Sequence, residues 1–327
     1  MNLKIMNILA FFLIPFYISG CAQEAIDDVD GNNISLEHSL SWSPDGSMLV
    51  YISNNTILIR RLDTGKSSPI TGMGFYEEPV WSPDSSMIAY SSSSYAVRAD
   101  IWVKNADGSG VAKRITSHNA ADNHPRWSPD GSRIAFQSYR TKSMDIWMKN
   151  SDGSGEDIRI VSDPAVDQNA EWSPDGQTLA FESKRSGNFD IWTVKASDAN
   201  LAIQITSGSA AETEPLWSPD GTKIAYLSDQ PYANGIWVIN SDGSGKSLFL
   251  SEGYTTSNIH SWSPDSKWIA FVSNQTVYAK RSDNTGDAIE IGKGIEPCWS
   301  PDGKKIAFIE LQDNQYGISI VEFSSVK

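Results

Sequence analysis

Basic residues are scarce in this chain. It has 26 Lys and Arg residues against 40 Asp and Glu residues, which gives a formal net charge of −14 at pH 7. No stripe of Lys or Arg is present to neutralise phosphates, and proteins that bind nucleic acid depend on such a stripe. Nucleic acid is therefore excluded as a partner.

The familiar catalytic motifs are missing as well. The sequence contains no Gly-x-Ser-x-Gly nucleophile elbow, no phosphate-binding loop and no paired-histidine zinc motif. Only two cysteines occur, Cys21 and Cys298. No histidine or acidic pattern near Cys298 suggests an activated thiol, so we expect it to be a small buried core residue. Nothing in the sequence demands catalysis.

A helical period is absent too, and a repeated five-residue phrase takes its place. Trp-Ser-Pro-Asp-Gly occurs seven times with small variations, at spacings of 37 to 46 residues. The copies begin at Trp42, Trp81, Trp127, Trp172, Trp217, Trp262 and Trp299. A fixed period in this range is typical of solenoids, propellers and arrays.

Each copy of the phrase predicts a hairpin corner between two strands. Proline fits the first central position of a type I turn, and glycine supplies the left-handed residue that follows it. A short apolar run such as Arg133–Phe136 comes next and indicates a strand. Ser85 and Ser266 replace the glycine in two copies, so those corners should be strained by up to about 1 kcal/mol or adopt another turn.

The repeated tryptophans indicate how the units pack. One hairpin cannot bury an indole alone, so seven equivalent indoles imply seven neighbouring sheets packed face to face. The alanine inside most of the following strands suggests a position where sheets converge.

Each unit contains four predicted strands. A second block, Asp-Ile-Trp, follows the hairpin at residues 100–102, 145–147 and 190–192. An Asp-Gly-Ser-Gly turn and a fourth short strand come after it. Four-stranded sheets repeated every 40 to 45 residues predict a β-propeller. The predicted fold class is all-β, with seven blades of four antiparallel strands.

The seventh unit stops before its outer strand. The segment Asn33–Leu36 precedes the first repeated Trp and belongs to no blade of its own. We predict that it completes the last blade and closes the ring, because such pairing would remove an exposed sheet edge. The predicted propeller domain spans residues 33–327.

The N-terminus is predicted to be a signal peptide, residues 1–20. Its apolar core, residues 8–18, is too short to span a bilayer, and the stretch that ends in Cys21 resembles a bacterial lipobox. The resemblance implies cleavage before Cys21 and attachment of lipid to its thiol; an ordinary secretory signal is the alternative. Ala22 follows in place of Asp, which by the same resemblance favours the outer membrane. Residues 21–32 are polar and acidic and are predicted to be a tether.

The composite repeat resembles that of the TolB propeller family. Its best copy runs from Pro125 to Ser138 and continues from Asp145 to Gly155. The resemblance covers the chain from about residue 33 onward and implies a propeller of the bacterial envelope. TolB itself has six blades and a separate N-terminal domain, for which there is no room between Cys21 and Trp42. The resemblance therefore implies a TolB-like lipoprotein.

Acidic residues recur at one place in the repeat, three residues before the Trp. In a propeller such equivalent positions meet at one mouth of the central channel, where carboxylates focus negative potential. Together with neighbouring acids they predict a partner-binding rim for a cation or a basic peptide; a solvated set of loops is the alternative. The predicted rim residues are Glu78, His124, Asn169, Glu214, Glu296, Asp122 and Glu212.

Two functions fit such a rim. TolB uses this side of its propeller for partner proteins, so the resemblance favours a monomeric, non-enzymatic envelope module that docks a protein or basic peptide. It would meet the membrane only through its lipid anchor and would face the periplasm or the cell surface. The alternative is a metal-dependent carbohydrate lyase of the oligogalacturonate type, or a glycan-binding propeller, with His124 and Glu214 as ligands of a divalent cation. The four histidines, at 38, 118, 124 and 260, lie at different offsets in the repeat, which favours scattered polar residues over a metal site.

Overall fold

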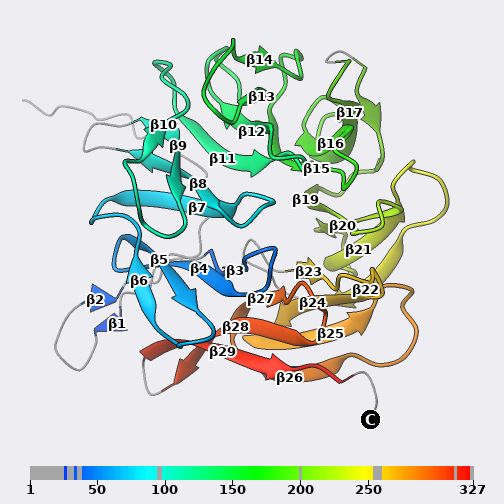
Figure 1. Ribbon diagram of the computed structural model, residues 1–327. Coiled ribbons are helices and arrows are strands. Elements are labelled where there is room, and N and C mark those ends of the chain that lie inside the picture. Colours follow the sequence, from blue (N-terminus) through cyan, green and yellow to red (C-terminus); the bar gives the residue numbers. More distant parts are fainter. Residues whose placement is uncertain are drawn as a thin grey trace, which may run out of the picture.

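The seven repeats form seven antiparallel sheets around a central axis (Figure 1). The computed structural model describes residues 26–27, 33–34, 39–93, 98–198, 201–252, 260–312 and 315–324, and every regular element in these ranges is a β-strand. The predicted all-β, seven-bladed propeller is confirmed. The described residues include no helix that is long and apolar enough to cross a membrane.

Each blade begins with its innermost strand and proceeds outward. Blade 1 contains β3 (Ser41–Trp42), β4 (Met48–Ser53), β5 (Thr56–Arg61) and β6 (Ser67–Pro69). Blade 2 contains β7 (Phe75–Trp81), β8 (Met87–Ser93), β9 (Ala99–Asn105) and β10 (Lys113–Arg114). Blade 3 contains β11 (Asp122–Trp127), β12 (Arg133–Ser138), β13 (Asp145–Asn150) and β14 (Ile158–Arg159). Blade 4 contains β15 (Asp167–Trp172), β16 (Thr178–Ser183), β17 (Asp190–Lys195) and β18 (Ile203–Gln204).

The remaining blades follow the same order. Blade 5 contains β19 (Glu212–Trp217), β20 (Lys223–Ser228), β21 (Gly235–Asn240) and β22 (Leu248–Glu252). Blade 6 contains β23 (His260–Trp262), β24 (Trp268–Ser273), β25 (Thr276–Arg281) and β26 (Ile289–Lys293). Blade 7 contains β27 (Ile295–Trp299), β28 (Lys305–Gln312) and β29 (Gln315–Glu322).

The serine of the repeated phrase closes each corner. In blade 4, Ser173 Oγ donates to Asp175 Oδ1 at 2.5 Å and accepts from the backbone N–H of Thr178 at 3.0 Å. Gly176 donates its N–H to the carbonyl of Ser173 at 2.8 Å and has a φ of 68°. The same Ser–Asp bond recurs in all seven corners. The hydrogen bond from Ser173 also lowers the pKa of Asp175. The phrase is therefore a hydrogen-bonded unit as well as a turn.

The two corners that lack glycine adopt the same left-handed turn, which was one of the two predicted outcomes. Ser85 has a φ of 62° and Ser266 a φ of 60°. Each hydroxyl accepts a hydrogen bond from the corner of the preceding blade, Ser85 from the N–H of Asp45 at 3.1 Å and Ser266 from that of Asp220 at 3.0 Å. The serine side chain thus offsets its backbone strain with a bond between blades.

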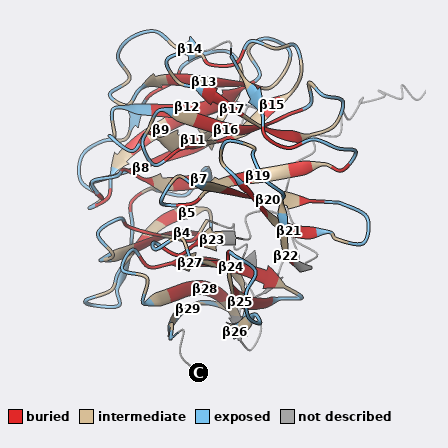
Figure 2. Cartoon of the chain, turned by 90° about the vertical axis from the view of Figure 1, so that its right-hand side faces the viewer, coloured by how far each residue is buried: buried red, intermediate tan, exposed pale blue. Residues whose placement is uncertain are grey.

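Six of the seven repeated tryptophans bond their blade to the one before it. The Trp172 indole N–H donates to the carbonyl of Arg126, the residue before the Trp of blade 3, at 3.2 Å. Five other blades have the equivalent bond. The alanines of the second strands are fully buried, as predicted. Figure 2 shows the buried residues concentrated in the middle of the blades. The core is therefore a set of interfaces between sheets.

The ring does not close in the predicted way. Among the described residues the sheet of blade 7 has three strands, and Ile34 pairs with Ile26 in a separate hairpin of β1 (Ile26–Asp27) and β2 (Asn33–Ile34). Residues 35–38 lie outside the described ranges. The prediction that Asn33–Leu36 completes blade 7 is therefore wrong for Asn33 and Ile34. A local hairpin closes a much shorter loop than pairing with the other end of the chain, so it costs less entropy.

Packing between blades 1 and 7 closes the ring instead. The Trp42 indole donates to the carbonyl of Cys298 at 3.1 Å, and the N–H of Leu40 donates to Glu296 Oε2 at 3.3 Å. Leu40 and Trp42 pack in one cluster with Ala307. Cys298 is a free, partly buried thiol beside this cluster, and burial raises its pKa well above the ordinary value. This seam uses the same indole bond as five of the other interfaces.

Candidate binding site at the centre of the ring

Five of the predicted rim residues share an unusual backbone conformation. Glu78, His124, Asn169, Glu214 and Glu296 have φ angles between 51° and 54°. Each lies where the innermost strand of its blade is interrupted by a bulge in register with the second strand. The left-handed region is rarely adopted by residues other than glycine and costs roughly 1–3 kcal/mol. Its repetition at five equivalent positions marks a site where strain is retained.

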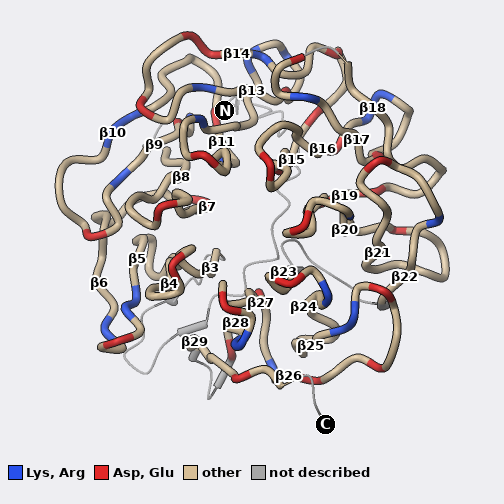
Figure 3. The backbone as a smooth tube through the Cα atoms, turned by 45° about the vertical axis from the view of Figure 1, so that its right-hand side comes forward, with Lys and Arg blue, Asp and Glu red and all other residues tan. Residues whose placement is uncertain are grey.

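The bulges lie on the strands that ring the central axis in Figure 1. Figure 3 shows acidic residues recurring near these inner strands around the ring. Glu78, His124, Asn169 and Glu214 therefore occupy equivalent positions on the inner strands of neighbouring blades. Glu296 occupies the same place in blade 7, where its carboxylate accepts from Leu40 across the seam.

Glu78 and His124 form a pair between blades 2 and 3. Glu78 Oε2 lies 2.8 Å from His124 Nδ1, and the two side chains are 20% and 29% exposed. Burial alone would raise the pKa of Glu78, but the charge of His124, its hydrogen bond and the charge of Arg126 lower that pKa below its ordinary value. Glu78 therefore holds a negative charge close to the axis.

A buried carboxylate connects the next blades. Glu182 of β16 is only 1% exposed. Its Oε1 accepts from Asn169 Nδ2 and from the backbone N–H of Glu214, both at 2.7 Å, and its Oε2 accepts from Gln168 Nε2 at 2.9 Å. Burial raises the pKa of Glu182, and these hydrogen bonds oppose the rise. Glu182 thus holds two of the left-handed residues in place.

Gln137 and Arg126 extend the network toward blade 3. Gln137 Oε1 accepts from the backbone N–H of Asn169 at 3.1 Å, and Arg126 Nε lies 3.1 Å from Glu171 Oε2. Burial raises the pKa of Glu171, an effect that Arg126 opposes. Hydrogen bonds and ion pairs therefore link one blade to the next from blade 2 to blade 5. We call these residues the central cluster: Glu78, His124, Arg126, Gln137, Asn169, Glu171, Glu182 and Glu214.

Sequence reasoning missed Gln137, Glu182, Arg126 and Glu171. Gln137 and Glu182 occupy the position after the Ile-Ala-Phe run, which is apolar in several other blades. A polar residue within a strand that is buried on both faces was the available signal.

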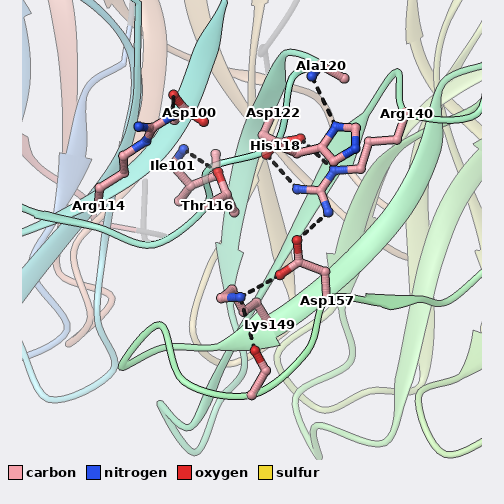
Figure 4. Close-up of polar contacts among 11 residues, drawn as sticks. Asp100, Ile101, Arg114, Thr116, His118, Ala120, Asp122, Arg140, Lys149 and Asp157 are labelled. Carbon is pink, nitrogen blue, oxygen red and sulfur yellow. Dashed lines mark hydrogen bonds and ion pairs between the residues drawn. The ribbon is translucent and has the colours of Figure 1, made fainter.

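Asp122 and Glu212 lie elsewhere. Asp122 is fully buried and is held by Arg140, whose Nη2 lies 2.7 Å from its Oδ2 (Figure 4). Glu212 is 6% exposed and lines a pocket with residues of blades 4 and 5. The structure thus separates the predicted rim into five bulge residues and two buried acids.

In the described part of the chain, the proposed metal ligands His124 and Glu214 belong to no cluster that could hold a metal ion. No group of three His, Cys, Asp or Glu residues there is arranged to hold a metal ion. His118 accepts from the N–H of Ala120 at 3.1 Å (Figure 4), and His124 pairs with Glu78. The side chains of His38 and His260 lie outside the described residues.

Comparison with known proteins places the chain in a family. The model of the TolB beta propeller domain matches residues 23–163, 109–226 and 154–290. The chain belongs to the TolB β-propeller domain family. A search of curated proteins found no match.

Solved structures agree with this fold. TolB from Acinetobacter baumannii is 21% identical with a TM-score of 0.58; the match covers 80% of this chain and 65% of that one. A putative TolB from Agrobacterium tumefaciens is 20% identical with a TM-score of 0.54, over 88% of this chain and 90% of that one. Oligogalacturonate lyase from Vibrio parahaemolyticus is 12% identical with a TM-score of 0.71, over 92% and 96%. These similarities show that other proteins share the propeller fold of this TolB-like chain.

Proposed function

We propose that the protein is a non-enzymatic binding module of the bacterial envelope that docks a protein or a basic peptide over the central cluster. The observation that carries the proposal is the row of left-handed residues Glu78, His124, Asn169 and Glu214 on successive inner strands. Strained backbone conformations cluster at binding sites. Carboxylates gathered on the inner strands create a negative potential that attracts a basic partner. The likeness to TolB supports a role in the envelope.

The test compares two double variants of equal charge. Glu78→Gln with Glu214→Gln removes two charges at the central cluster, whereas Glu156→Gln with Glu290→Gln removes two from exposed outer positions. Cross-linked capture from envelope extract should recover a protein with the native chain and the outer variant, and about tenfold less with the central variant. Capture should weaken as ionic strength rises. Equal capture by both variants, or no specific capture by the native chain, would contradict docking at this site.

A carbohydrate lyase or glycan-binding propeller is the second candidate. The observation that favours it is the Glu78–His124 pair, a carboxylate beside an imidazole on the inner strands, since paired groups of these types serve in general acid–base catalysis. Incubation with oligogalacturonate and Mn²⁺ should then release unsaturated products, and a chelator should stop the release. If the native protein releases such products and Glu78→Gln does not, the lyase function is favoured over the binding module.

We also propose that Cys21 carries a lipid and that the protein is anchored to the outer membrane. The lipobox-like sequence before Cys21 supports this placement. Cys21→Ser should move the protein from the membrane fraction to the soluble fraction, as measured by fractionation and immunoblotting. Retention of the variant in the membrane fraction would refute the anchor.

A further inference from the structure

A pocket of about 250 Å³ lies between blades 4 and 5. Thr206, which follows β18, lines its blade 4 side. Residues of β19, β20 and β21, of the loop between β20 and β21 and of the loop after β21 line the rest, among them Glu212, Tyr226, Ser228, Gln230 and Trp237. No residue of the central cluster takes part, so this pocket does not depend on the function proposed above.

Two buried carboxylates in this region have unused oxygens. Glu212 is 6% exposed and Asp190 is 1% exposed. Glu212 Oε1 accepts from Ser228 Oγ at 3.2 Å, and Asp190 Oδ2 accepts from Gln204 Nε2 at 3.0 Å. Within the described residues no other side chain donates to Glu212 Oε2 or Asp190 Oδ1, and burial together with the interaction between the two carboxyl groups raises the pKa of Glu212. Buried carboxylate oxygens without partners are costly. Asp100 Oδ1 and Asp167 Oδ2 also lack a partner although each of those acids pairs with an arginine, so the site between blades 4 and 5 differs from the others in its missing arginines.

The neighbouring interface shows what occupies the equivalent place. Between blades 2 and 3, Asp100 pairs with Arg114 at 2.6 Å and Asp122 with Arg140 at 2.7 Å (Figure 4). The acids Asp100 and Asp122 correspond in the repeat to Asp190 and Glu212. Here each acid has its own guanidinium.

The interface between blades 3 and 4 has the same arrangement. Asp145 pairs with Arg159 at 2.6 Å, and Asp167 pairs with Arg185 at 2.9 Å. Arg185 lies thirteen residues after Trp172, and Gln230 lies thirteen residues after Trp217. Gln204 likewise takes the place of Arg159 in the repeat. Blades 4 and 5 therefore keep both acids but have lost both arginines.

The aromatic residues that stack on Arg140 and Arg185 in blades 3 and 4 have aromatic counterparts in blade 5. The Arg140 guanidinium carbon lies 5.2 Å from the ring centre of Phe136 and 4.9 Å from that of Trp147. The corresponding distances from Arg185 to Phe181 and Trp192 are 5.4 and 4.8 Å. The equivalent residues of blade 5 are Tyr226 and Trp237, and both line the pocket.

We propose that this pocket binds the guanidinium group of an arginine side chain supplied by a peptide or protein partner. A guanidinium is planar, donates to two carboxylate oxygens at once and stacks on aromatic faces. The side chains that hold Arg140 and Arg185 in their own blades have counterparts around the empty space. The raised pKa of Glu212, about 7, agrees with a carboxyl group that burial and the neighbouring Asp190 leave without a compensating cation.

The probe is Nα-acetyl-arginine methylamide, and its neutral isostere, the citrulline derivative, is the control ligand. In isothermal titration calorimetry the arginine derivative should bind the full-length protein with a Kd on the order of 1 mM, and the citrulline derivative at least about tenfold more weakly. Glu212→Gln should weaken the arginine derivative by about tenfold, whereas the exposed Glu156→Gln should leave binding unchanged.

Gln230→Arg supplies the missing guanidinium from within the blade. Because it restores the arrangement of Arg140 and Arg185, the variant should fold with a higher melting temperature and no longer bind the probe. Three outcomes would overturn the proposal: equal binding of the arginine and citrulline derivatives, no binding of either, or unchanged binding by Gln230→Arg. Binding of Ca²⁺ that excludes the arginine derivative would also overturn it, in favour of a cation site.

Discussion

Replacing Arg140 with Gln is expected to lower the free energy of unfolding by about 3–5 kcal/mol, because removal of one partner leaves a buried charge uncompensated. The Arg140 side chain is 6% exposed and joins the fully buried Asp122 to Asp157 (Figure 4). It also stacks on Phe136 and Trp147. Urea unfolding at pH 7, with linear extrapolation to water, measures the loss.

The matched control is an arginine of a surface ion pair. Arg61 and Asp63 lie 2.8 Å apart with side chains about 60% exposed, and solvent screens such pairs so that they add little to stability. Arg61→Gln should therefore change the free energy of unfolding far less than Arg140→Gln. If Arg140→Gln costs no more than Arg61→Gln, the buried ion pairs of Arg140 with Asp122 and Asp157 do not stabilise blade 3.

The fold was predictable because its main determinants are local and repeated. The corner phrase fixes where each hairpin turns. Trp172 and its equivalents recur once in each sheet, and their large indoles are buried only when neighbouring sheets pack face to face. The ring closure was not predictable in the same way. Asn33 and Ile34 could pair either with the nearby β1 or with the sheet of blade 7 at the other end of the chain. The sequence predicted the second, because blade 7 lacks an outer strand.

The candidate site was predictable in position but not in chemistry. Counting back three residues from each Trp located Glu78, His124 and Asn169. The count carried no information on backbone strain or on the partner across the blade interface. The role of Glu182 depends on a hydrogen bond from the backbone of Glu214 in the next blade, and a single repeat does not encode such a contact. The role of Asp122 depends on Arg140, which lies in the turn after β12 of the same blade, and only the folded hairpin brings the two together.

The loss of paired arginines between blades 4 and 5 has a consequence for stability as well as for binding. The groups that face Glu212 are Asp190 from β17, Tyr226 from β20 and the hydroxyls of Ser228 and Thr206. Tyr226 is itself affected, since burial, aided by Glu212, raises its pKa to about 12. None of these groups is a cation, so burial and Asp190 raise the pKa of Glu212 to about 7.

Glu212→Gln is accordingly expected to stabilise the protein above neutral pH. A carboxyl group whose pKa is higher in the folded state favours folding below its unfolded pKa and loses that contribution as pH rises through about 7. The variant cannot ionise at this position, so its free energy of unfolding should match the native value within about 1 kcal/mol at pH 4.5 and exceed it by about 2 kcal/mol at pH 8. Urea titrations across this range measure the difference, with Glu156→Gln as the control that should follow the native curve. Parallel curves for Glu212→Gln and the native protein would show that folding does not raise the pKa of Glu212, which would contradict this account.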